Sequence, residues 1–496
     1  MSLIEKKEQG VMAGPTIETD PQAFTENPEE PEGPVGREDT EAKKRLAQLL
    51  EQYGATWDGP DDPQDPYNWP EWRKVTIGII FSVGQLVTLM SASIIAAALD
   101  NIAHDLGTDA STTQITLSIY FLGLGIGPFL IAALCEMNGR KNIWIISNLW
   151  YILWNALCPL TGPVMADMYH AKDRGKSLAI ASFLPYLGPA LGPIIGGIVV
   201  DFVYWPWLFW VVSIFASFIT ILGALVIKES YTPVLLQRKA AARSGQSGSP
   251  SLSPLKWAFW HDFVSRLRTY LERPLRLLIR RPIIQAISLV LALNFGIYTF
   301  MLSTFATLWI DRYNQSALLG SLHYISFSIG FCFTAQVGGR IMDVIYRRLR
   351  DRSNNKGEGQ PEFRVPYMIP GVIFIPAGLF WYGWSAQHRI TWVMVDLGAI
   401  IFTCGSSILA QSLLAYTLDL FGHVGASANA ATRLLSNILG FVFPIFAPQL
   451  YARLDYGWGN SLLAFIFVLL GVPVPLCLWI WGEKLRALGK RLDESH

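Results

Sequence analysis

The sequence predicts an all-α membrane protein whose chain crosses the bilayer many times. Three observations lead to this prediction: the 496 residues are 51% hydrophobic, only 16% of them are charged, and the apolar residues form long runs separated by short charged clusters. A soluble protein carries about 25% charged residues, so the composition excludes a soluble enzyme and also a fibrous or disordered protein. Segments that cross a bilayer must satisfy their own backbone hydrogen bonds, so we expect each apolar run to be a helix.

The first 70 residues differ in composition from the rest of the chain. They contain 16 acidic and 6 basic residues and include proline-rich stretches, whereas the remaining residues contain 22 acidic and 33 basic ones. Such a segment buries too little apolar surface to fold, so residues 1–70 are predicted to be a disordered acidic tail. No basic leader with an apolar stretch and a cleavage site is visible, so we expect the first span to direct insertion.

A bilayer span needs about 20 predominantly apolar residues. This criterion predicts eleven spans, at 75–99, 112–135, 142–161, 177–200, 206–228, 284–309, 319–342, 366–385, 390–412, 424–451 and 459–481. They are divided by a basic segment into an N-terminal helical bundle and a C-terminal six-helix bundle. The predicted domains are therefore the tail 1–70, the bundle 71–228, a basic central loop 229–283, the bundle 284–481 and a C-terminal tail 482–496.

The basic residues predict the topology, because cytosolic loops of membrane proteins are enriched in Lys and Arg. Arg73 and Lys74 place the N-terminus in the cytosol. All later basic clusters, including the central loop, then belong on the cytosolic side only if the chain crosses the bilayer twelve times. The extra crossing would have to lie within 142–169, but these 28 residues have length for one span and not two. The sequence therefore supplies eleven spans, and one span is expected to be missing near Cys158–Thr161.

Several motifs within residues 66–496 resemble those of a known family. They are PYNWPEWRK before the first span, GPFLIAALCEMNGRK at 127–141, LGPALGPIIGG at 187–197, KESYTPVLLQRKA at 228–240, GGRIMDVIYRRLR at 338–350 and YTLDLFGHVGASANAATRLLSNILG at 416–440. Together they resemble the major facilitator superfamily, in particular its fungal branch of twelve-span drug:proton antiporters, the kind associated with multidrug resistance. The resemblance implies a two-bundle fold with alternating access and proton-coupled efflux of a drug or small secondary metabolite.

The family pattern has a fourth span after residues like Cys158, and this sequence lacks it. Two alternatives to efflux stay open. One is a polyamine or nutrient transporter, although few acidic residues lie in the middle of spans. The other is a non-transporting or inactive paralogue, because a core helix is missing. An enzyme is not expected, since no GxSxG, HExxH or paired-carboxylate arrangement is present.

The cytosolic turn between the second and third spans places an acid beside cations, which is the chemistry of a charge lock between helices. The resemblance supports this role over that of a plain positive-inside anchor. The predicted gating residues of the first half are Gly127, Glu136, Gly139, Arg140 and Lys141. Those of the second half are Gly339, Arg340, Asp343 and Arg347, with Asp419 at a cytosolic helix end and Arg433 as an anchor between helices.

The run at 187–197 places small residues on one helix face. Gly188, Gly192 and Gly196 are four residues apart, a spacing that allows two helices to approach closely, while Pro189 and Pro193 are expected to kink the helix. Static helix packing explains the pattern equally simply. The resemblance implies an antiporter-type helix, in which Gly197 is included.

Polar residues within spans are candidates for a substrate cavity, because an apolar cavity with a few polar groups suits amphipathic small molecules. Each is as well explained by a hydrogen bond between helices. These residues are Asn294, Tyr298, Gln336 and Gln411. No acid in the middle of a span stands out as the proton carrier. Asn314 begins an N-glycosylation sequon in a loop that twelve spans would place outside.

The expected partners follow from this interpretation: a small amphipathic molecule, protons and the lipid bilayer, with the protein acting as a monomer. We expect no cofactor other than the proton gradient as energy source, and no nucleic acid. The five cysteines have no metal-ligand spacing, so no metal site is predicted. The plasma membrane is favoured over the vacuolar membrane.

Overall fold

The computed structural model describes residues 43, 45–51, 55–95, 99–107, 115, 118–124, 127, 134–135, 139–154, 184–243, 265, 272, 274–352, 360–421 and 425–494. By its internal contacts the chain divides into two units, Met1–Pro60 and Asp61–His496. All that follows concerns the second unit.

Every regular element that the structure describes is helical. The first half of the unit contains η2 (Pro66–Asn68), α2 (Glu71–Ile94), α3 (Leu99–Leu106), α5 (Arg140–Trp154), η4 (Pro185–Leu187), α8 (Gly188–Phe202), α9 (Trp207–Val226) and α10 (Thr232–Arg243). Pro70 immediately precedes α2, and prolines lie in the first turn of η2 and η4, where a missing backbone N–H has no cost.

The second half is a continuous series of long helices with short breaks. Its elements are α12 (Pro282–Thr307), η5 (Leu308–Arg312), α13 (Ala317–Leu322), α14 (Ile325–Phe333), η6 (Thr334–Gly338), α15 (Gly339–Arg352), η7 (Pro361–Tyr367), α16 (Met368–Gln387), α17 (Trp392–Phe421), α18 (Gly425–Gly471) and α19 (Pro473–Glu494). The segments η5 and η6 are single π-helical turns, a form that is frequent at functional sites. α18 is interrupted at Asp455, whose φ is 55°.

Seven helical segments in the described part of the chain are long and apolar enough to cross a membrane. They are Glu71–Ser91, Trp207–Val226, Pro282–Arg312, Ala317–Arg352, Pro361–Gln387, Trp392–Phe421 and Ser427–Ala487, with Pro185–Val199 as a shorter apolar helix. The predicted all-α, polytopic fold is thereby confirmed. The last segment contains two predicted spans, 424–451 and 459–481. Residues 155–183 lie outside the described part, so the absence of a fourth span near Cys158 stays a prediction.

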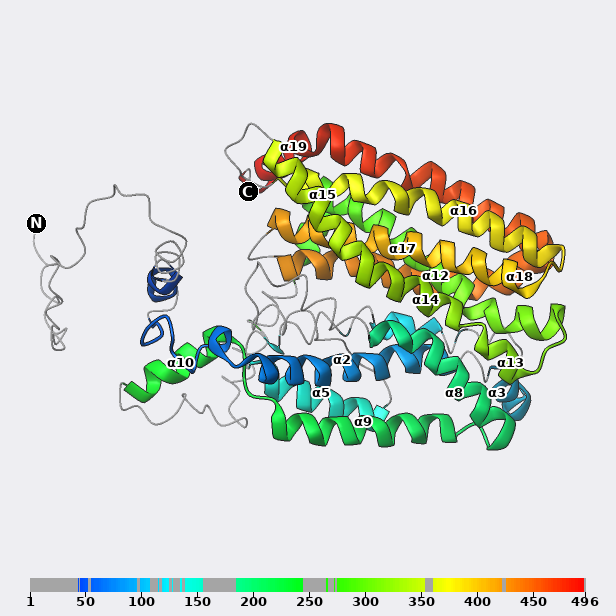
Figure 1. Cartoon of the computed structure of the whole chain (residues 1–496), viewed down its shortest axis with the longest axis horizontal. Helices are drawn as coiled ribbons and strands as arrows, with labels where there is room; N and C mark the ends of the chain where they lie inside the picture. The colour runs from blue at the N-terminus through cyan, green and yellow to red at the C-terminus, as the bar shows by residue number, and fades with distance from the viewer. Residues whose placement is uncertain are drawn as a thin grey trace, which may run out of the picture. The chain divides into compact units, whose positions relative to one another are not determined.

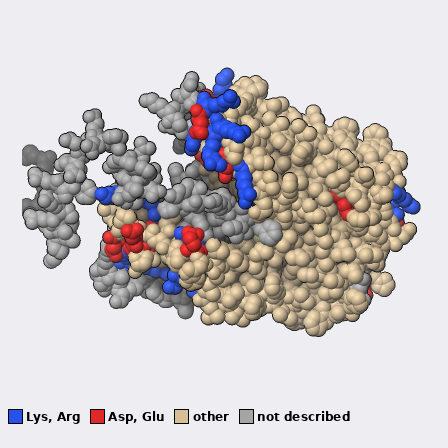
Figure 2. All heavy atoms as spheres, viewed as in Figure 1, with Lys and Arg blue, Asp and Glu red and all other residues tan. Residues whose placement is uncertain are grey.

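One face of α9 carries apolar side chains that are exposed at the surface. Its side chains at helical spacing are between 61% and 80% exposed: Trp210, Ile214, Phe218, Ile221 and Leu225. In water such a stripe would be costly, whereas lipid tails accommodate it. Figure 2 shows the same property over a larger area, because charged groups gather toward the end of the molecule where α15 and α19 lie and are sparse across the rest of that face.

The helices form two groups, as Figure 1 shows: α2, α5, α8 and α9 lie together, and α12 to α19 form the other group. In the second group α12 packs mainly on α18, and α16 on α17. This group has one large apolar core, whereas two smaller clusters fill the first group. The groups meet where α8 packs against α13 and α14, so α8 belongs to one bundle and contacts the other.

Candidate functional site

The glycines of α8 allow two different helices to approach it. A Cβ atom at Gly188 would lie 2.8 Å from the Cβ of Leu89, and one at Gly192 would lie 2.6 Å from the carbonyl oxygen of Met90. Both neighbours belong to α2, and the hydroxyl of Ser93 donates to the carbonyl of Gly188 at 3.2 Å. The glycine stripe therefore packs directly on α2.

Gly197 lies on another face of α8 and meets the second bundle. A Cβ at this position would lie 2.8 Å from the Oγ of Ser321 and 3.3 Å from the Cα of Leu318, both in α13. Gly196 beside it is buried. Of the two prolines, Pro189 lies in the first turn of α8, where it does not bend the helix, and Pro193 lies in the interior.

In the first half, a contact on the side predicted to be cytosolic is built on a carboxylate that the sequence interpretation did not select. Glu229 is 8% exposed and accepts the backbone N–H groups of Arg140 at 2.8 Å and Lys141 at 3.1 Å. It also accepts the amides of Ser230 and Tyr231. An anion at the first turn of α5 is stabilised by unpaired amides and by the helix dipole.

Gly139 makes this contact possible. Its φ is +87°, a conformation that favours glycine, and a Cβ atom here would lie 2.7 Å from the Cδ of Glu229. The guanidinium of Arg140 lies 5.0 Å from the ring centre of Tyr231. Of the other predicted residues, Gly127 is buried in a helical position, and Glu136 lies outside the described residues. We call Glu229 with the turn 139–141 the first cytosolic contact.

The corresponding contact of the second half is a side-chain network. Arg364 donates from Nη1 to Asp343 at 3.1 Å and from Nε to Asp419 at 2.9 Å, so it links α15 to α17. Its guanidinium also lies 4.1 Å from the ring centre of Tyr346. Two predicted acids are thus brought together by an arginine from the PEFRVPYMIPG run that had no predicted role. We call Asp343, Arg364 and Asp419 the second cytosolic contact.

The remaining predicted residues of this loop lie at its surface. Arg340 and Arg347 are exposed. The Nε of Arg347 donates a hydrogen bond to the carbonyl of Asp343 at 3.3 Å. Nothing lies within 4 Å of a Cβ built on Gly339. The surroundings therefore require a glycine at position 139, whereas position 339 has room for a Cβ atom.

A polar cluster lies where the two bundles meet. The hydroxyl of Tyr186, just before α8, interacts with the side chains of Gln411 and Ser407 of α17 and is within electrostatic range of Arg433 of α18. Gln411 donates to Ser407 at 3.0 Å. Arg433 is exposed although it lies well inside a span, and no carboxylate among the described residues pairs with it. We call Tyr186, Ser407, Gln411 and Arg433 the interface cluster.

Aromatic rings border the interface cluster. Phe331 stacks on Tyr186 with ring centres 5.4 Å apart and planes inclined by 9°. Tyr298 meets the same Phe331 ring edge-on at 5.4 Å. Of the predicted cavity residues, Gln411 and Tyr298 therefore lie together, and Tyr186 is the member that the sequence interpretation missed.

The other two predicted cavity residues lie elsewhere. Asn294 is 4% exposed and donates to the carbonyl of Ser406 at 3.2 Å, which is the hydrogen bond between helices that the sequence left open as an alternative. Gln336 is half-buried in η6, which continues directly into α15. Neither side chain is among the groups that contact Tyr186.

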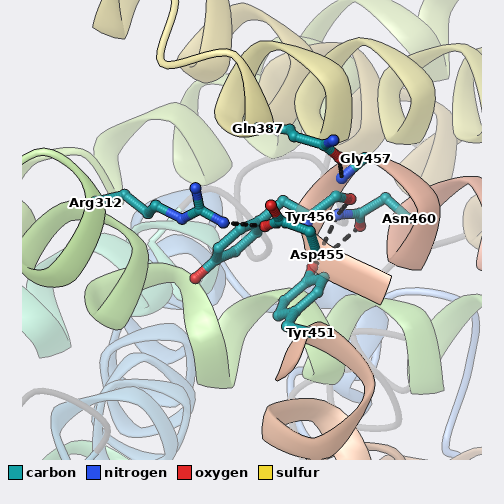
Figure 3. Close-up of polar contacts among 7 residues, drawn as sticks. All are labelled: Arg312, Gln387, Tyr451, Asp455, Tyr456, Gly457 and Asn460. Carbon is teal, nitrogen blue, oxygen red and sulfur yellow. Dashed lines mark hydrogen bonds and ion pairs between the residues drawn. The ribbon is translucent and has the colours of Figure 1, made fainter. Parts of the chain in front are cut away.

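The outer end of the second half is tied by an ion pair. Figure 3 shows Arg312, at the end of η5, directed at the carboxylate of Asp455. Asp455 also accepts the amide of Tyr456 at 2.8 Å, and Gln387 accepts the amide of Gly457 at 2.8 Å. The break in α18 is therefore held by side chains from two other helices.

Two further features lie apart from the interface cluster. A cavity of about 450 Å³ opens among α12, α17 and α19 and is lined by Arg281, Leu420, Glu483 and Arg486 among others. Asn314, the sequon residue, is exposed with a φ of 51°; its glycosylation stays a prediction. Within the described part of the chain no group of three potential metal ligands occurs.

Comparison with known proteins finds one matching family model and several similar efflux pumps. A model of the Major Facilitator Superfamily matches residues 155–444. The chain is 36% identical to the probable efflux pump mfs2 of Aspergillus flavus, over 79% of this chain and 98% of that protein. It is 34% identical to the efflux pump vrtL of Penicillium aethiopicum, over 88% and 90%, and 34% identical to the efflux pump radE of Floropilus chiversii, over 87% and 84%.

Solved structures share the fold at low sequence identity. A proton:xylose symporter bound to 6-bromo-6-deoxy-D-glucose is similar with a TM-score of 0.58 and 14% identity, covering 83% of this chain and 96% of that one. The xylose transporter XylE from E. coli in a partially occluded, inward-open conformation has a TM-score of 0.53 and 14% identity, covering 82% and 98%.

Proposed function

The chain belongs to the major facilitator superfamily as a multi-pass membrane transporter related to fungal efflux pumps, and we propose that it exports a small amphipathic compound, a drug or secondary metabolite, in exchange for protons. The observation that carries this proposal is the interface cluster. A hydroxyl, an amide and a cation lie between two bundles and are bordered by aromatic rings. Such a surface suits a ligand with an aromatic body and a polar group.

The charge of the interface cluster favours one kind of substrate. Ionisable groups within a membrane are costly and usually line a substrate or ion path. Arg433 is the charged member, and no described carboxylate pairs with it. An acidic or strongly polarised carbonyl group on the substrate would satisfy this cation, whereas a cationic substrate would be repelled.

The relatives support export as the direction of transport. Gly197 of α8 closes against Ser321 of α13 at the end that the charge pattern places outside. For an exporter, an arrangement that is closed outside is the state that takes up substrate from the cytosol. Export of a metabolite from the cell favours the plasma membrane.

Purified full-length protein in liposomes tests the proposal. Fluorescein, an anion, and rhodamine 6G, a cation, are suitable probes because both are aromatic and amphipathic. We expect an imposed pH gradient to drive fluorescein at least about tenfold faster than rhodamine 6G, and Arg433→Gln to remove most of that preference, since a tenfold ratio corresponds to about 1.4 kcal/mol. Collapse of the gradient with an ionophore is the control.

The alternatives give different results in the same assay. Flux of fluorescein that ignores the pH gradient overturns proton coupling. Transport of spermidine in preference to both dyes favours the polyamine alternative. Protein that is folded by circular dichroism but moves none of these compounds favours the non-transporting paralogue.

A further inference from the structure

A histidine at the outer end of the second half has a hydrogen-bond partner at each ring nitrogen. His323 follows α13, and its Nδ1 lies 2.7 Å from Oδ2 of Asp396 in α17. Its Nε2 lies 3.1 Å from Oε1 of Gln315, in the turn between η5 and α13. The imidazole also stacks on the indole of Trp309 with ring centres 3.6 Å apart. The ring is thus fixed in position and orientation.

These contacts fit a protonated ring, and they fit a neutral ring once the Gln315 amide is turned. A neutral imidazole carries one N–H, so it can donate to only one of two oxygen acceptors, whereas an imidazolium donates to both. When the proton on Nε2 leaves, the lone pair of that nitrogen faces the carbonyl oxygen of Gln315. The Gln315 amide must then turn so that its NH₂ group donates to Nε2, while Nδ1–H stays on Asp396. Gaining or losing one proton therefore changes the direction of one hydrogen bond.

The surroundings isolate this pair from other charges without burying it completely. The side chains of His323 and Asp396 are 12% and 14% exposed. Among the described residues, the titratable groups that face the pair are Tyr382, which lies within electrostatic range of Asp396, and Tyr313, which lies within electrostatic range of both Asp396 and Arg389. The hydroxyl of Tyr313 donates to the carbonyl of Ile390. Trp392 covers the imidazole edge-on and is itself 55% exposed.

The pair also lies next to the contact between the bundles. His323 is the C-cap of α13, the helix whose Ser321 meets Gly197 of α8. A charge-assisted hydrogen bond from His323 to Asp396 ties the end of α13 to α17. Because α13 contacts the first bundle, proton occupancy here acts on the outer contact.

We propose that His323 and Asp396 form a proton-binding site that is loaded from the extracellular side and stabilises the closed outer contact. The proposal rests on the proton-coupled export proposed above and deepens it by naming a site at which external protons regulate the outer contact. One hydronium gives its proton to Nε2 of His323, which then donates to Gln315, and the proton leaves by the same nitrogen. Ordinary histidine titrates near pH 6.5, within the range that an external pH change covers.

Nuclear magnetic resonance of the full-length protein in detergent micelles tests the site without any substrate. The seven histidines are labelled with ¹⁵N in their rings, and His323→Gln identifies the signals of His323. We expect both ring nitrogens of His323 to titrate in one step between pH 5 and 8. Asp396→Asn should change this titration, because it removes the carboxylate that contacts Nδ1.

His388 is the matched control. It also lies at the outer end and stacks on a tryptophan, Trp384, but no carboxylate among the described residues contacts it. Its titration should be the same in wild type and Asp396→Asn. A His323 signal that does not titrate between pH 5 and 8, or whose midpoint Asp396→Asn leaves unchanged, overturns the proposal.

Transport separates this proposal from the proposed function. In liposomes, His323→Gln should reduce gradient-driven fluorescein flux about tenfold or more and leave exchange of fluorescein at equal pH within about twofold, while His388→Gln changes neither. Equal loss in both modes overturns a regulatory role of external protons at the site. If wild-type protein moves no probe, the proposed export fails, and the resonance titration alone decides whether the proton site exists.

Discussion

Glu229 accepts the backbone N–H of Arg140 at 2.8 Å across 89 residues of sequence. The same carboxylate serves three further amides, so one side chain at the end of α9 fixes the start of α5. These four contacts are formed with main-chain amides. The following predictions begin from this contact.

Replacement of Glu229 tests how much the carboxylate contributes. Glu229→Ala leaves four amides without their acceptor. A hydrogen bond to a charged group contributes about 1.5–3 kcal/mol to stability. We expect a loss of about 2 kcal/mol or more in stability, seen as a lower melting temperature of the purified protein. Glu229→Gln, which keeps one oxygen, should lose less. Asp61→Ala, at an exposed position, should change the melting temperature little.

Gly139 and Gly339 form a natural pair for comparison. Gly139→Ala forces a left-handed φ on a residue with a Cβ and directs that atom at Glu229, so we expect a cost of about 2 kcal/mol. Gly339→Ala has open space around it and should be neutral or slightly stabilising, because alanine favours the helix. Equal melting temperatures for the two variants would contradict the assigned geometry.

Removal of Arg364 should loosen the second cytosolic contact. Its side chain is 14% exposed, while Asp343 and Asp419 are 48% and 31% exposed. After allowance for that exposure, Arg364→Ala should cost about 1–2 kcal/mol, and Arg364→Lys should recover only part because it lacks the guanidinium fork. Thermal unfolding measures the cost. Arg350→Ala, which removes an exposed pair with Asp351, is the control.

Tyr186 tests the interface cluster. Tyr186→Phe keeps the ring that stacks on Phe331 and removes only the hydroxyl. We expect the KM for fluorescein transport to rise about tenfold, the equivalent of one lost hydrogen bond, with an unchanged melting temperature. Tyr204→Phe, at an exposed outer position, should leave KM as it is. A change in kcat with no change in KM would argue against substrate contact at Tyr186.

Gly197 tests the contact between the bundles. A leucine at this position cannot fit beside the backbone of Leu318, so Gly197→Leu should open the outer end. In the Ser321→Cys background, Ser321 being 1% exposed in the native protein, labelling by a membrane-impermeant maleimide should increase several-fold when Gly197→Leu is added. Unchanged labelling would show that the bundles do not meet there.

The helices were largely predictable from the sequence because the bilayer leaves few alternatives. Runs of about 20 apolar residues must be helical, and the boundaries of α9 and α16 agree with their predicted spans to within a few residues. The glycine spacing of α8 also predicted a close helix approach correctly, since glycine has no side chain to keep a neighbour away. Periodicity did not reveal that Gly188 and Gly197 meet different helices.

The partners of the charged residues were less predictable, because they depend on tertiary distance. The sequence placed Asp343 and Asp419 among gating residues but gave no reason to join them through Arg364. Glu229 stands next to Lys228 in the sequence and resembles an ordinary interfacial charge until the fold brings it to the start of α5. His323 likewise had no predicted role, since neither Asp396 nor Gln315 is at helical spacing from it.

The two cytosolic contacts constrain amino-acid substitution in different ways. Because Glu229 accepts the main-chain amide of Lys141, an exchange at Lys141 preserves that hydrogen bond whatever the new side chain, provided that the turn keeps its glycine. The second contact is formed by side chains alone, so Asp343, Arg364 and Asp419 must change together or remain as they are. Among homologues, we therefore expect covariation at these three positions and independent substitution at 141.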